Sequence, residues 1–458
     1  MLGTGSARGS REWVNRKFPD HAQWPRVRRL LHLGAVVCVV QGVGWAIYYG
    51  LHGMTVLSLV LCALAMVGVG CFSVSHKRDR LSLVVIAHVL VAMTVFVSLA
   101  ETPTAAAARS THLFLLPIGA ATFFLFRSEA LYLRWILPAL CVAALVWLAV
   151  SPVSLGAQLE RLPDSVRRVR HALNTLAAMG LTGGVLAIFR EDLTDQMDQY
   201  AALVRGIAQR ELRAYLQPQV AINGKVVGAE LLLRWDRPGH GLQSPAEFIP
   251  LAEKTGLIHE IGLLVLERAC VQVAQWSQQA GVREWMLSVN VSPLQLASDT
   301  FVEDVRGIIR RTGAPANRLR LEITESALAH DHEKVAATMN ALREEGVSWS
   351  LDDFGTGFSS LALLQVLPLD ELKIDQTFVR SMGAEPSQRE LVRKIIEIAA
   401  VLGVSTVAEG VETEQQRAWL TSMGCRVFQG YLFGRPVTAD AFDAAHVRPL
   451  LAGRGVAG

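Results

Sequence analysis

Residues 349–353 read Trp349-Ser350-Leu351-Asp352-Asp353, a short apolar run that stops at two carboxylates. Other short apolar runs after Lys225 also stop at a carboxylate, an amide or a lysine, and they span residues 226–230, 287–290, 319–322, 372–375, 406–409 and 427–429. Apolar runs of this length, rich in β-branched residues, are typical of buried strands. Seven such endings predict a ring of parallel strands whose ends surround one site for a hard metal ion.

Helix-like amphipathic stretches alternate with these runs, at residues 246–255, 260–279, 300–312, 332–345, 387–402 and 413–423. Strands that alternate with helices indicate βα units and parallel pairing. About eight strands within roughly 240 residues fit the length of a TIM-like (β/α)8 barrel. In such barrels the chemistry lies at the carboxyl ends of the strands, where this sequence places its acidic residues. We therefore expect an α/β barrel in this half of the chain.

The composition divides the 458-residue chain, which is too long for one ordinary domain. Residues 30–190 are very apolar, whereas residues 200–448 have the composition of a soluble globular domain. The net charge of +3 is close to balance, so it gives no reason to expect a nucleic-acid duplex as partner. The expected parts are a basic leader (1–30), a transmembrane region (31–190), a linker (191–213), the barrel (205–448) and a tail (449–458).

The apolar half contains six candidate membrane-spanning helices, at residues 31–51, 54–74, 81–100, 111–127, 131–150 and 171–189. Each approaches the roughly 20 apolar residues that are needed to cross the hydrocarbon of a lipid bilayer. A helical bundle of this kind, placed before a soluble domain, suggests a sensory input module. The sequence does not identify its ligand.

Basic residues predict the orientation of these spans, because cytoplasmic loops carry an excess of Lys and Arg. The leader and the second connection are basic, through Arg16, Lys17, Arg26, Arg28, Arg29, His76, Lys77, Arg78 and Arg80. An even number of spans then returns the barrel to the cytoplasmic side of a bacterial inner membrane. The last loop, with Arg161, Arg167, Arg168 and Arg170, fits this orientation poorly. Either it is an exception, or residues 155–170 form an amphipathic helix at the membrane interface.

Two features of this half leave alternatives open. His88 lies inside the third span, where an ionisable residue is either a functional group or a buried hydrogen-bonding group. In the linker 191–213, charged and apolar positions alternate at near-helical spacing. That pattern fits a solvated helix and equally a signalling helix that carries movement from the membrane to the soluble domain.

The ordered motifs of the soluble half resemble the EAL family of cyclic di-GMP phosphodiesterases. They are Gln217-Pro218, Glu230-Leu231-Leu232-Leu233-Arg234-Trp235, Ser288-Val289-Asn290-Val291-Ser292, Glu322-Ile323-Thr324-Glu325-Ser326, Asp352-Asp353-Phe354-Gly355-Thr356-Gly357, Leu372-Lys373-Ile374-Asp375, Val407-Ala408-Glu409-Gly410-Val411-Glu412 and Gln429-Gly430-Tyr431. Leu231 replaces the family's usual alanine and must fit on the opposite face of its strand, and Phe358 replaces a common tyrosine. No Gly-Gly-Asp-Glu-Phe cyclase signature is present in the sequence, so synthesis of the dinucleotide is not expected.

The resemblance implies a membrane-bound enzyme that hydrolyses cyclic di-GMP to linear 5′-pGpG with Mg2+ or Mn2+. Oxygen ligands without a His or Cys cluster favour these hard ions over zinc. By resemblance, the first metal is held by Glu230, Asn290, Glu322 and Asp352. Asp353 helps to hold a second metal, with Asp375 and Glu409 nearby.

The resemblance also assigns catalytic and substrate roles. Lys373 orients or activates the attacking water, Glu409 is the candidate general base, and Gln429 positions water or substrate. Gln217 and Arg234, together with Asp353, contact the substrate. Glu325 anchors the loop from Asp353 to Ser360 by hydrogen bonding. The expected assembly is a homodimer in the lipid bilayer.

Two other functions are compatible with the same chain. One is a catalytically silent receptor that binds cyclic di-GMP, although silent relatives usually lose acidic residues and none is missing here. The other is a transporter with a regulatory tail, which the few intramembrane charges and the absence of a repeat argue against.

Overall fold

The structure is a computed structural model that describes residues 24–76, 79–104, 108–127, 129–155, 162–328, 332–355, 364–383 and 386–452. Several residues named in the sequence analysis lie outside the described part of the chain. They are Arg16, Lys17, Lys77, Arg78, Arg161, Phe358 and loop residues 356–360. The chain divides into two compact units, Met1–Met197 and Asp198–Gly458.

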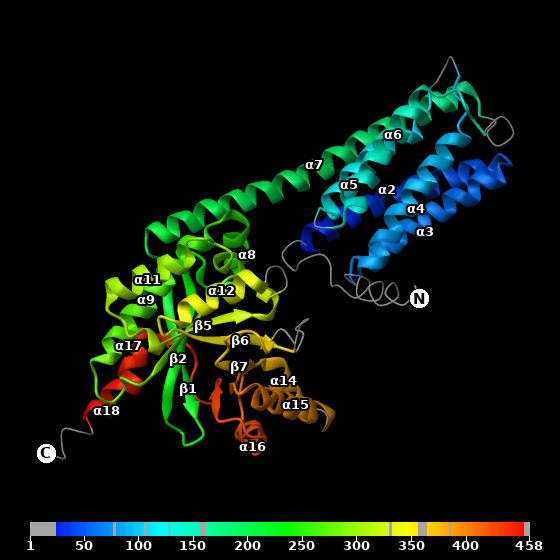
Figure 1. Cartoon of the computed structure of the whole chain (residues 1–458). Coiled ribbons are helices and arrows are strands. Elements are labelled where there is room, and N and C mark those ends of the chain that lie inside the picture. The colour runs from blue at the N-terminus through cyan, green and yellow to red at the C-terminus, as the bar shows by residue number, and fades with distance from the viewer. Residues whose placement is uncertain are drawn as a thin grey trace. The chain divides into compact units, whose positions relative to one another are not determined.

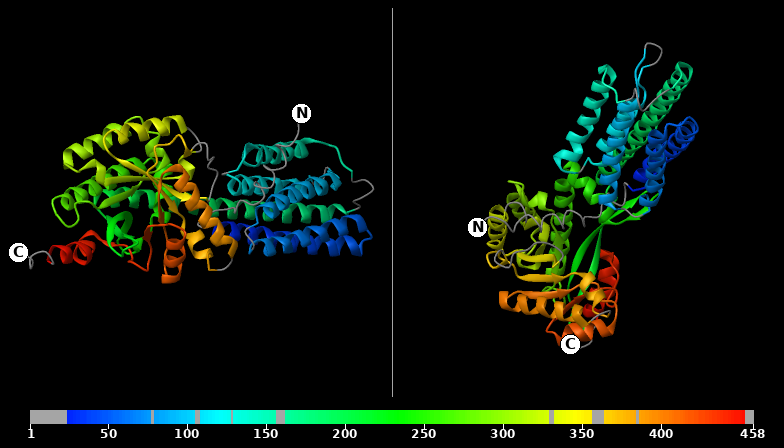
Figure 2. Two further views of the ribbon diagram at one scale, coloured as in Figure 1. Left: turned by 60° about the horizontal axis from the view of Figure 1, so that its bottom comes forward. Right: turned by 90° about the vertical axis from the view of Figure 1, so that its right-hand side faces the viewer.

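The first unit is helical. Its long helices are α2 (Trp24–Leu51), α3 (Thr55–Val74) and α4 (Arg80–Ala100), which Figure 2 shows side by side. Three further helical segments follow, namely η1 (Thr111–Phe114) with α5 (Leu115–Leu125), η2 (Tyr132–Ile136) with α6 (Leu137–Val150), and α7 (Asp164–Ala208). A helix therefore covers each of the six predicted spans. Five of them are long and apolar enough to cross a membrane, while Thr111–Leu125 is apolar but shorter.

Helix α7 runs through the expected boundary between the last span and the linker. It is continuous from Asp164 to Ala208, so the last predicted span and the linker belong to one helix. Residues 164–170 are its first turns and do not form a separate interfacial helix. Arg167 and Arg170 are buried there and donate to the Thr102 carbonyl and the Tyr49 hydroxyl, and Arg168 is exposed. The last two linker residues lie in the first strand, which begins at Leu212.

The histidine inside the third span is hydrogen-bonded. His88 Nδ1 lies 2.8 Å from the backbone oxygen of Val84, and His88 Nε2 lies 2.9 Å from the Tyr132 hydroxyl. Both ring nitrogens therefore have a partner within the bundle. These contacts favour the hydrogen-bonding alternative for this residue.

The second unit is a closed barrel. Its strands are β1 (Leu212–Ala221), β2 (Val226–Arg237), β3 (Gly241–Gln243), β4 (Met286–Asn290), β5 (Leu319–Thr324), β6 (Ser348–Phe354), β7 (Glu371–Ile374), β8 (Ser405–Ala408), β9 (Val427–Gln429) and β10 (Val437–Thr438). The ring runs β1-β9-β8-β7-β6-β5-β4-β2 and closes because β1 also pairs with β2. Strands β3 and β10 extend the sheet outside this ring.

Strand direction differs from a regular (β/α)8 barrel at one place. The seven strands with polar endings are parallel, as predicted, but β1 is antiparallel to both β2 and β9. The reason is local, because only residues 222–225 join β1 to β2, with Gly224 at φ +78°. So short a connection closes a hairpin and cannot cross over the barrel.

Helices cover the outside of the barrel (Figure 1). Those that match the predicted stretches are α8 (Pro245–Thr255), α9 (Ile258–Ser277), α11 (Phe301–Thr312), α12 (His332–Arg343), α15 (Pro386–Leu402) and α16 (Glu414–Ser422). Shorter ones are α10 (Pro293–Leu296), α14 (Gln376–Ser381), α17 (Ala439–Phe442) and α18 (Arg448–Ala452). The predicted alternation of strands and helices is therefore confirmed.

Side-chain alternation along the strands decides what faces the barrel interior. On β5, Leu319, Leu321 and Ile323 are fully buried in the hydrophobic core, and Arg320 and Glu322 lie between them. Successive side chains of a strand point to opposite faces. When the apolar set packs under the helices, Glu322 and its equivalents on the other strands must point into the barrel.

Candidate active site

The site forms at the carboxyl ends of the parallel strands. In the register, Asn290 at the end of β4 lies beside Glu322 on β5, and Thr324 lies beside Asp352 on β6. Glu409 follows the last residue of β8, and its backbone N–H donates to the carbonyl oxygen of Ile374 on β7 at 3.1 Å. Parallel pairing therefore brings these polar ends to one edge of the ring.

Lys373 is the centre of the cluster. Its side chain is fully buried, and its Nζ lies 2.6 Å from Glu409 Oε1 and 2.7 Å from Glu322 Oε2. Glu230 Oε2 is 3.4 Å away and Asp352 Oδ1 is 3.5 Å away. One ammonium thus contacts carboxylates from four different elements of the barrel.

Amide side chains complete one side of the cluster. Asn290 Nδ2 donates to Glu230 Oε1 at 2.7 Å, and Gln429 Nε2 donates to Glu230 Oε2 at 2.5 Å. The same Gln429 nitrogen lies 3.3 Å from Gln217 Oε1, and Gln217 Nε2 donates to the Gly434 carbonyl at 3.1 Å. The structure therefore places both predicted glutamines beside a predicted metal ligand.

The pKa directions show that negative charge is in excess. Burial would lower the pKa of Lys373, but the surrounding carboxylates raise it well above its usual value. Burial raises the pKa of Glu322 well above its usual range and that of Glu409 to about 8, because Lys373 only partly offsets the neighbouring acids. Burial also acts on Glu230, but Lys373 and the amide hydrogen bonds outweigh it and lower its pKa.

These residues fit a divalent cation in their chemistry. Carboxylate and amide oxygens are the donors that Mg2+ and Mn2+ prefer. Among the residues that the structure describes, none hydrogen-bonds to the buried Glu322 Oε1, which leaves one acidic oxygen available as a ligand. Within the described residues, no three His, Cys, Asp or Glu side chains are already arranged around one point as ligands, because the carboxylates turn toward Lys373.

Asp353 and Asp375 form a separate pair beside this cluster. Asp353 adopts a left-handed backbone with φ +56°, which is uncommon outside glycine and marks local strain. Burial, together with Asp352 and Asp375, raises its pKa to about 6. Asp375 accepts the Thr377 N–H at 2.9 Å and so caps α14. This cap is a role that the sequence pattern did not predict for Asp375.

Arg234 and Glu325 are two further residues that the resemblance singled out. The guanidinium of Arg234, four residues after Glu230 on β2, donates to the Leu233 carbonyl at 2.8 Å. Glu325 is buried at the start of η4 (Glu325–Leu328), directly after β5. The loop that it is expected to anchor lies largely outside the described residues, so its role stays a prediction.

The unusual leucine of the family motif is accommodated as expected. Leu231 is 3% exposed and belongs to the hydrophobic core, on the strand face opposite Glu230.

The sequence patterns missed other polar residues inside the barrel. Gln219 on β1 donates from Nε2 to Gln429 Oε1 at 3.1 Å. Near the opposite strand ends, Arg320 on β5 forms an ion pair with the buried Glu371 of β7, and the Ser350 hydroxyl donates to Glu371 at 3.2 Å. Arg320 and Glu371 could have been found from the sequence, because each lies two residues before a site residue, Glu322 or Lys373. Side chains two residues apart on a strand lie on the same face.

A family model for the EAL domain matches residues 200–436, which is more than half of the chain. The chain belongs to the EAL family. The resemblance of the motifs is thereby confirmed, and the residues around Lys373 all lie within the EAL domain.

Curated relatives share this domain. A bifunctional diguanylate cyclase/cyclic di-GMP phosphodiesterase, MucR of Pseudomonas aeruginosa, is 42% identical over 252 residues, which cover 55% of this chain and 37% of MucR. The oxygen sensor protein DosP of Escherichia coli is 41% identical over 241 residues, 52% of this chain and 30% of DosP. The chain therefore spans only about a third of the length of these relatives.

Solved structures agree with the barrel. A P. aeruginosa MucR phosphodiesterase in complex with c-di-GMP has a TM-score of 0.52 and 41% identity, and the match covers 54% of this chain and 99% of that one. The EAL enzyme Bd1971, bound to cAMP and cyclic di-GMP, has a TM-score of 0.54 and 28% identity. The match covers 62% of this chain and 76% of the Bd1971 chain.

Proposed function

We propose that the protein is a membrane-bound phosphodiesterase that hydrolyses cyclic di-GMP to linear 5′-pGpG. The carrying observation is the convergence of Glu230, Glu322, Asp352 and Glu409 on Lys373. The likeness of the EAL domain to a MucR phosphodiesterase solved with c-di-GMP supports the choice of substrate.

The proposed reaction is attack of water on one phosphodiester. Breaking the bond between phosphorus and the 3′ oxygen leaves a 5′-phosphate and a free 3′-hydroxyl, which is the linear dinucleotide. Glu409, in its ionised form, takes the proton from the attacking water; burial raises its pKa to about 8, which makes this carboxylate a stronger base than an exposed one. Lys373, which is hydrogen-bonded to Glu322 and paired with Glu409, keeps the two acids oriented and stabilises negative charge on the phosphoryl oxygens.

Mg2+ or Mn2+ completes the proposed site. Glu230, Asn290, Glu322 and Asp352 would hold one ion, and Asp353 would help to hold a second, with Asp375 and Glu409 close by. When bound, such ions neutralise phosphoryl oxygens and lower the pKa of water. Gln429 and Gln217 would position water or substrate, and Arg234 would bind phosphate through its planar guanidinium.

The first unit is the proposed regulatory part. Its apolar helices suggest a membrane region, and we place the EAL domain on the cytoplasmic side of a bacterial inner membrane. The single helix α7 carries the chain from this region to within a few residues of β1, which supports its role as the signalling element. Homodimerisation belongs to the same proposal.

The test is turnover of cyclic di-GMP by the full chain in detergent, with and without Mg2+. Glu230→Gln should abolish formation of pGpG, because it removes a carboxylate that is buried in the cluster. Glu390→Gln, on the exposed surface of α15, is the matched control and should leave turnover unchanged. Unchanged turnover in Glu230→Gln would refute the site. Tight binding of cyclic di-GMP without product, in either metal, would favour the silent receptor instead.

A further inference from the structure

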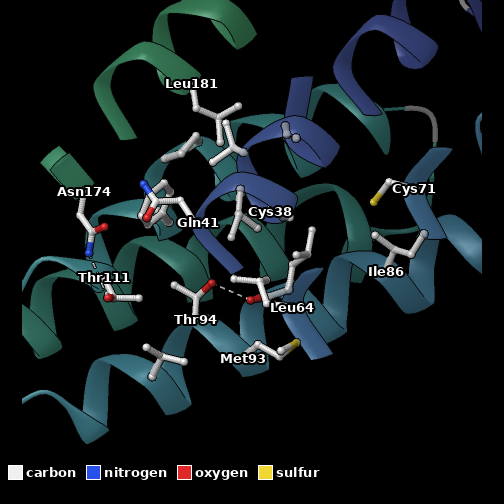
Figure 3. Close-up of a pocket in the computed structure, with 18 of the residues that line it drawn as sticks. Cys38, Gln41, Leu64, Cys71, Ile86, Met93, Thr94, Thr111, Asn174 and Leu181 are labelled. Atoms are coloured by element: carbon white, nitrogen blue, oxygen red, sulfur yellow. Dashed lines mark hydrogen bonds between the residues drawn. The ribbon is translucent and has the colours of Figure 1, made fainter. Parts of the chain in front are cut away.

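The first unit contains a pocket that is separate from the candidate active site. It lies between α2, α3, α4, α5 and α7 and is shown in Figure 3. The open space there is about 1400 Å³, a figure that also counts the adjoining solvent.

Most of the pocket wall is apolar. Leu64 of α3, Ile86 and Met93 of α4 and Leu181 of α7 line it from different sides. The apolar lining continues to Leu31 near one end of the bundle and to Phe114 near the other. A hydrocarbon chain is the ligand part that such a wall favours, because burial of apolar surface stabilises the bound state without hydrogen bonds.

One end of the pocket is polar. In Figure 3, Gln41, Thr111 and Asn174 lie toward one side of the view, and Cys71 and Ile86 lie toward the other. Asn174 Nδ2 donates to the Thr111 hydroxyl at 3.3 Å. The pocket therefore has a direction, with polar groups gathered at one end.

A buried arginine stands at this polar end. Arg170 is 6% exposed, lines the pocket, and donates from Nη1 to the Tyr49 hydroxyl at 2.7 Å. Its Nε lies 3.6 Å from Glu101 Oε1. The Glu101 carboxylate is already engaged, because it accepts the backbone N–H groups of Ser110 at 2.8 Å and Thr111 at 3.3 Å.

Positive charge exceeds negative charge around this end, counted over the described residues. Arg109 and Arg167 are also buried, and they donate to the backbone carbonyls of Glu101 and Thr102 at 3.3 and 2.5 Å. Of these three arginines, Arg170 lines the pocket and pairs with Glu101, and the other two hold the backbone of residues 101 and 102 beside it. Charged groups are rare and costly within a membrane-type helical bundle, and they commonly mark binding sites. An anionic head group complements such a cluster through charge-assisted hydrogen bonds.

We propose that this pocket binds a single-chain anionic amphiphile. Its hydrocarbon tail lies between the apolar walls, and its carboxylate head group lies at the end formed by Arg170 and Asn174. This site depends on neither the metal ions nor the dinucleotide chemistry of the EAL domain, so it stands or fails separately from the proposed phosphodiesterase.

The first experiment uses the unaltered full chain in lipid nanodiscs and radiolabelled palmitate as the probe. We expect saturable binding of one palmitate per chain. Hexadecanol should compete about tenfold or more weakly, because it lacks the charged hydrogen bonds, and hexadecyltrimethylammonium should not compete. Absence of saturable binding beyond that of empty nanodiscs would overturn the proposal. Equal competition by the alcohol or the cation would overturn the anionic head group.

Variants then locate the two ends of the ligand. Arg170→Gln should weaken palmitate binding about tenfold or more, and Arg170→Lys should weaken it less. Arg168→Gln, an exposed neighbour on α7, is the matched control. Leu181→Trp should fill the tail region and abolish binding, whereas Leu176→Trp, at an exposed position of the same helix, should not.

Unchanged binding in Arg170→Gln or Leu181→Trp would place the ligand elsewhere and overturn the proposal. Size-exclusion chromatography checks the fold of each variant. If Arg170→Gln does not fold because its contact with Glu101 is lost, the competition series on the unaltered chain decides the nature of the head group.

Discussion

Lys373 Nζ lies 2.6 Å from Glu409 Oε1, and the two residues come from adjacent parallel strand ends, β7 and the residue after β8. This contact joins the fully buried ammonium of the site to the carboxylate that we propose as general base. Because Glu322 and Glu230 share the same ammonium, the ionisation of these two acids depends on Lys373.

Lys373→Met should destabilise the metal-free protein by about 3–5 kcal/mol, because it leaves buried carboxylates without their cation. Mg2+ should recover more stability in this variant than in the wild type, since the ion then supplies the missing positive charge. Urea unfolding followed by circular dichroism, with and without Mg2+, measures both effects. Lys394→Met, on the exposed face of α15, is the control. A variant as stable as the wild type without Mg2+ would contradict the central role of Lys373.

Glu409→Gln should lower kcat by about 10²–10⁴-fold, as expected for loss of a general base. The affinity for cyclic di-GMP should change only a few-fold, because Gln217 and Arg234 are retained. Steady-state kinetics and calorimetric titration separate the two quantities. Glu412→Gln, at the exposed ion pair with Arg380, should behave as the wild type. A large loss of affinity with unchanged kcat would assign Glu409 to substrate binding.

Metal affinity should depend on pH through Asp353. Its pKa in the folded state is raised from 3.8 to about 6, so near pH 5 it holds a proton that it would have lost in the unfolded chain. Raising the pH through about 6 ionises Asp353. This ionisation lowers the stability of the metal-free protein and makes the carboxylate available to Mg2+. Mg2+ affinity should therefore fall as the pH drops below 6, by at most about tenfold per pH unit for one proton. Calorimetric titrations at several pH values test this, and Asp353→Asn should lose this component of the pH dependence.

Gln219→Leu tests a residue that the sequence patterns did not single out. It removes the donor to Gln429 Oε1, leaves a buried amide oxygen without that partner, and should cost about 1–3 kcal/mol of stability. Because Gln429 then loses its orientation toward Glu230, turnover should also fall, by about tenfold. Unfolding and turnover are measured on the same preparation, with the exposed Gln278→Leu as control. A loss of stability with full turnover would limit Gln219 to a structural role.

The buried pair of Arg320 and Glu371 should show strong coupling. Glu371→Leu alone should cost about 3 kcal/mol, since it leaves the partly buried arginine without its carboxylate partner, while the double variant with Arg320→Leu should recover much of this loss. A double-mutant cycle from urea unfolding gives the coupling energy directly. Additive effects would show that the two side chains do not stabilise each other.

The barrel and most of the cluster were predictable because two signals are local. Apolar alternation identifies the strands, and the polar residue at each strand end identifies the edge. Glu322 and Asp352 could be placed together on that basis, since parallel strands end at the same edge. The antiparallel β1 was predictable only from the short connection at residues 222–225, which the count of eight strands did not take into account.

Other parts of the site depended on distant contacts. Asp375 follows a strand in the motif, but its partner Thr377 makes it the cap of α14. Gln219 carries no motif of its own, and only the closure of β1 against β9 brings it to Gln429.

The sequence by itself determined the division into an apolar helical half and an EAL barrel, and it determined which residue types end each strand, because both are set by local composition and periodicity. Only the tertiary structure decided which polar group each acid meets. The carboxylates converge on Lys373, and Arg170 meets Glu101 and Tyr49, because ring closure and helix packing bring together side chains that are far apart in the chain. No local pattern encodes those distances.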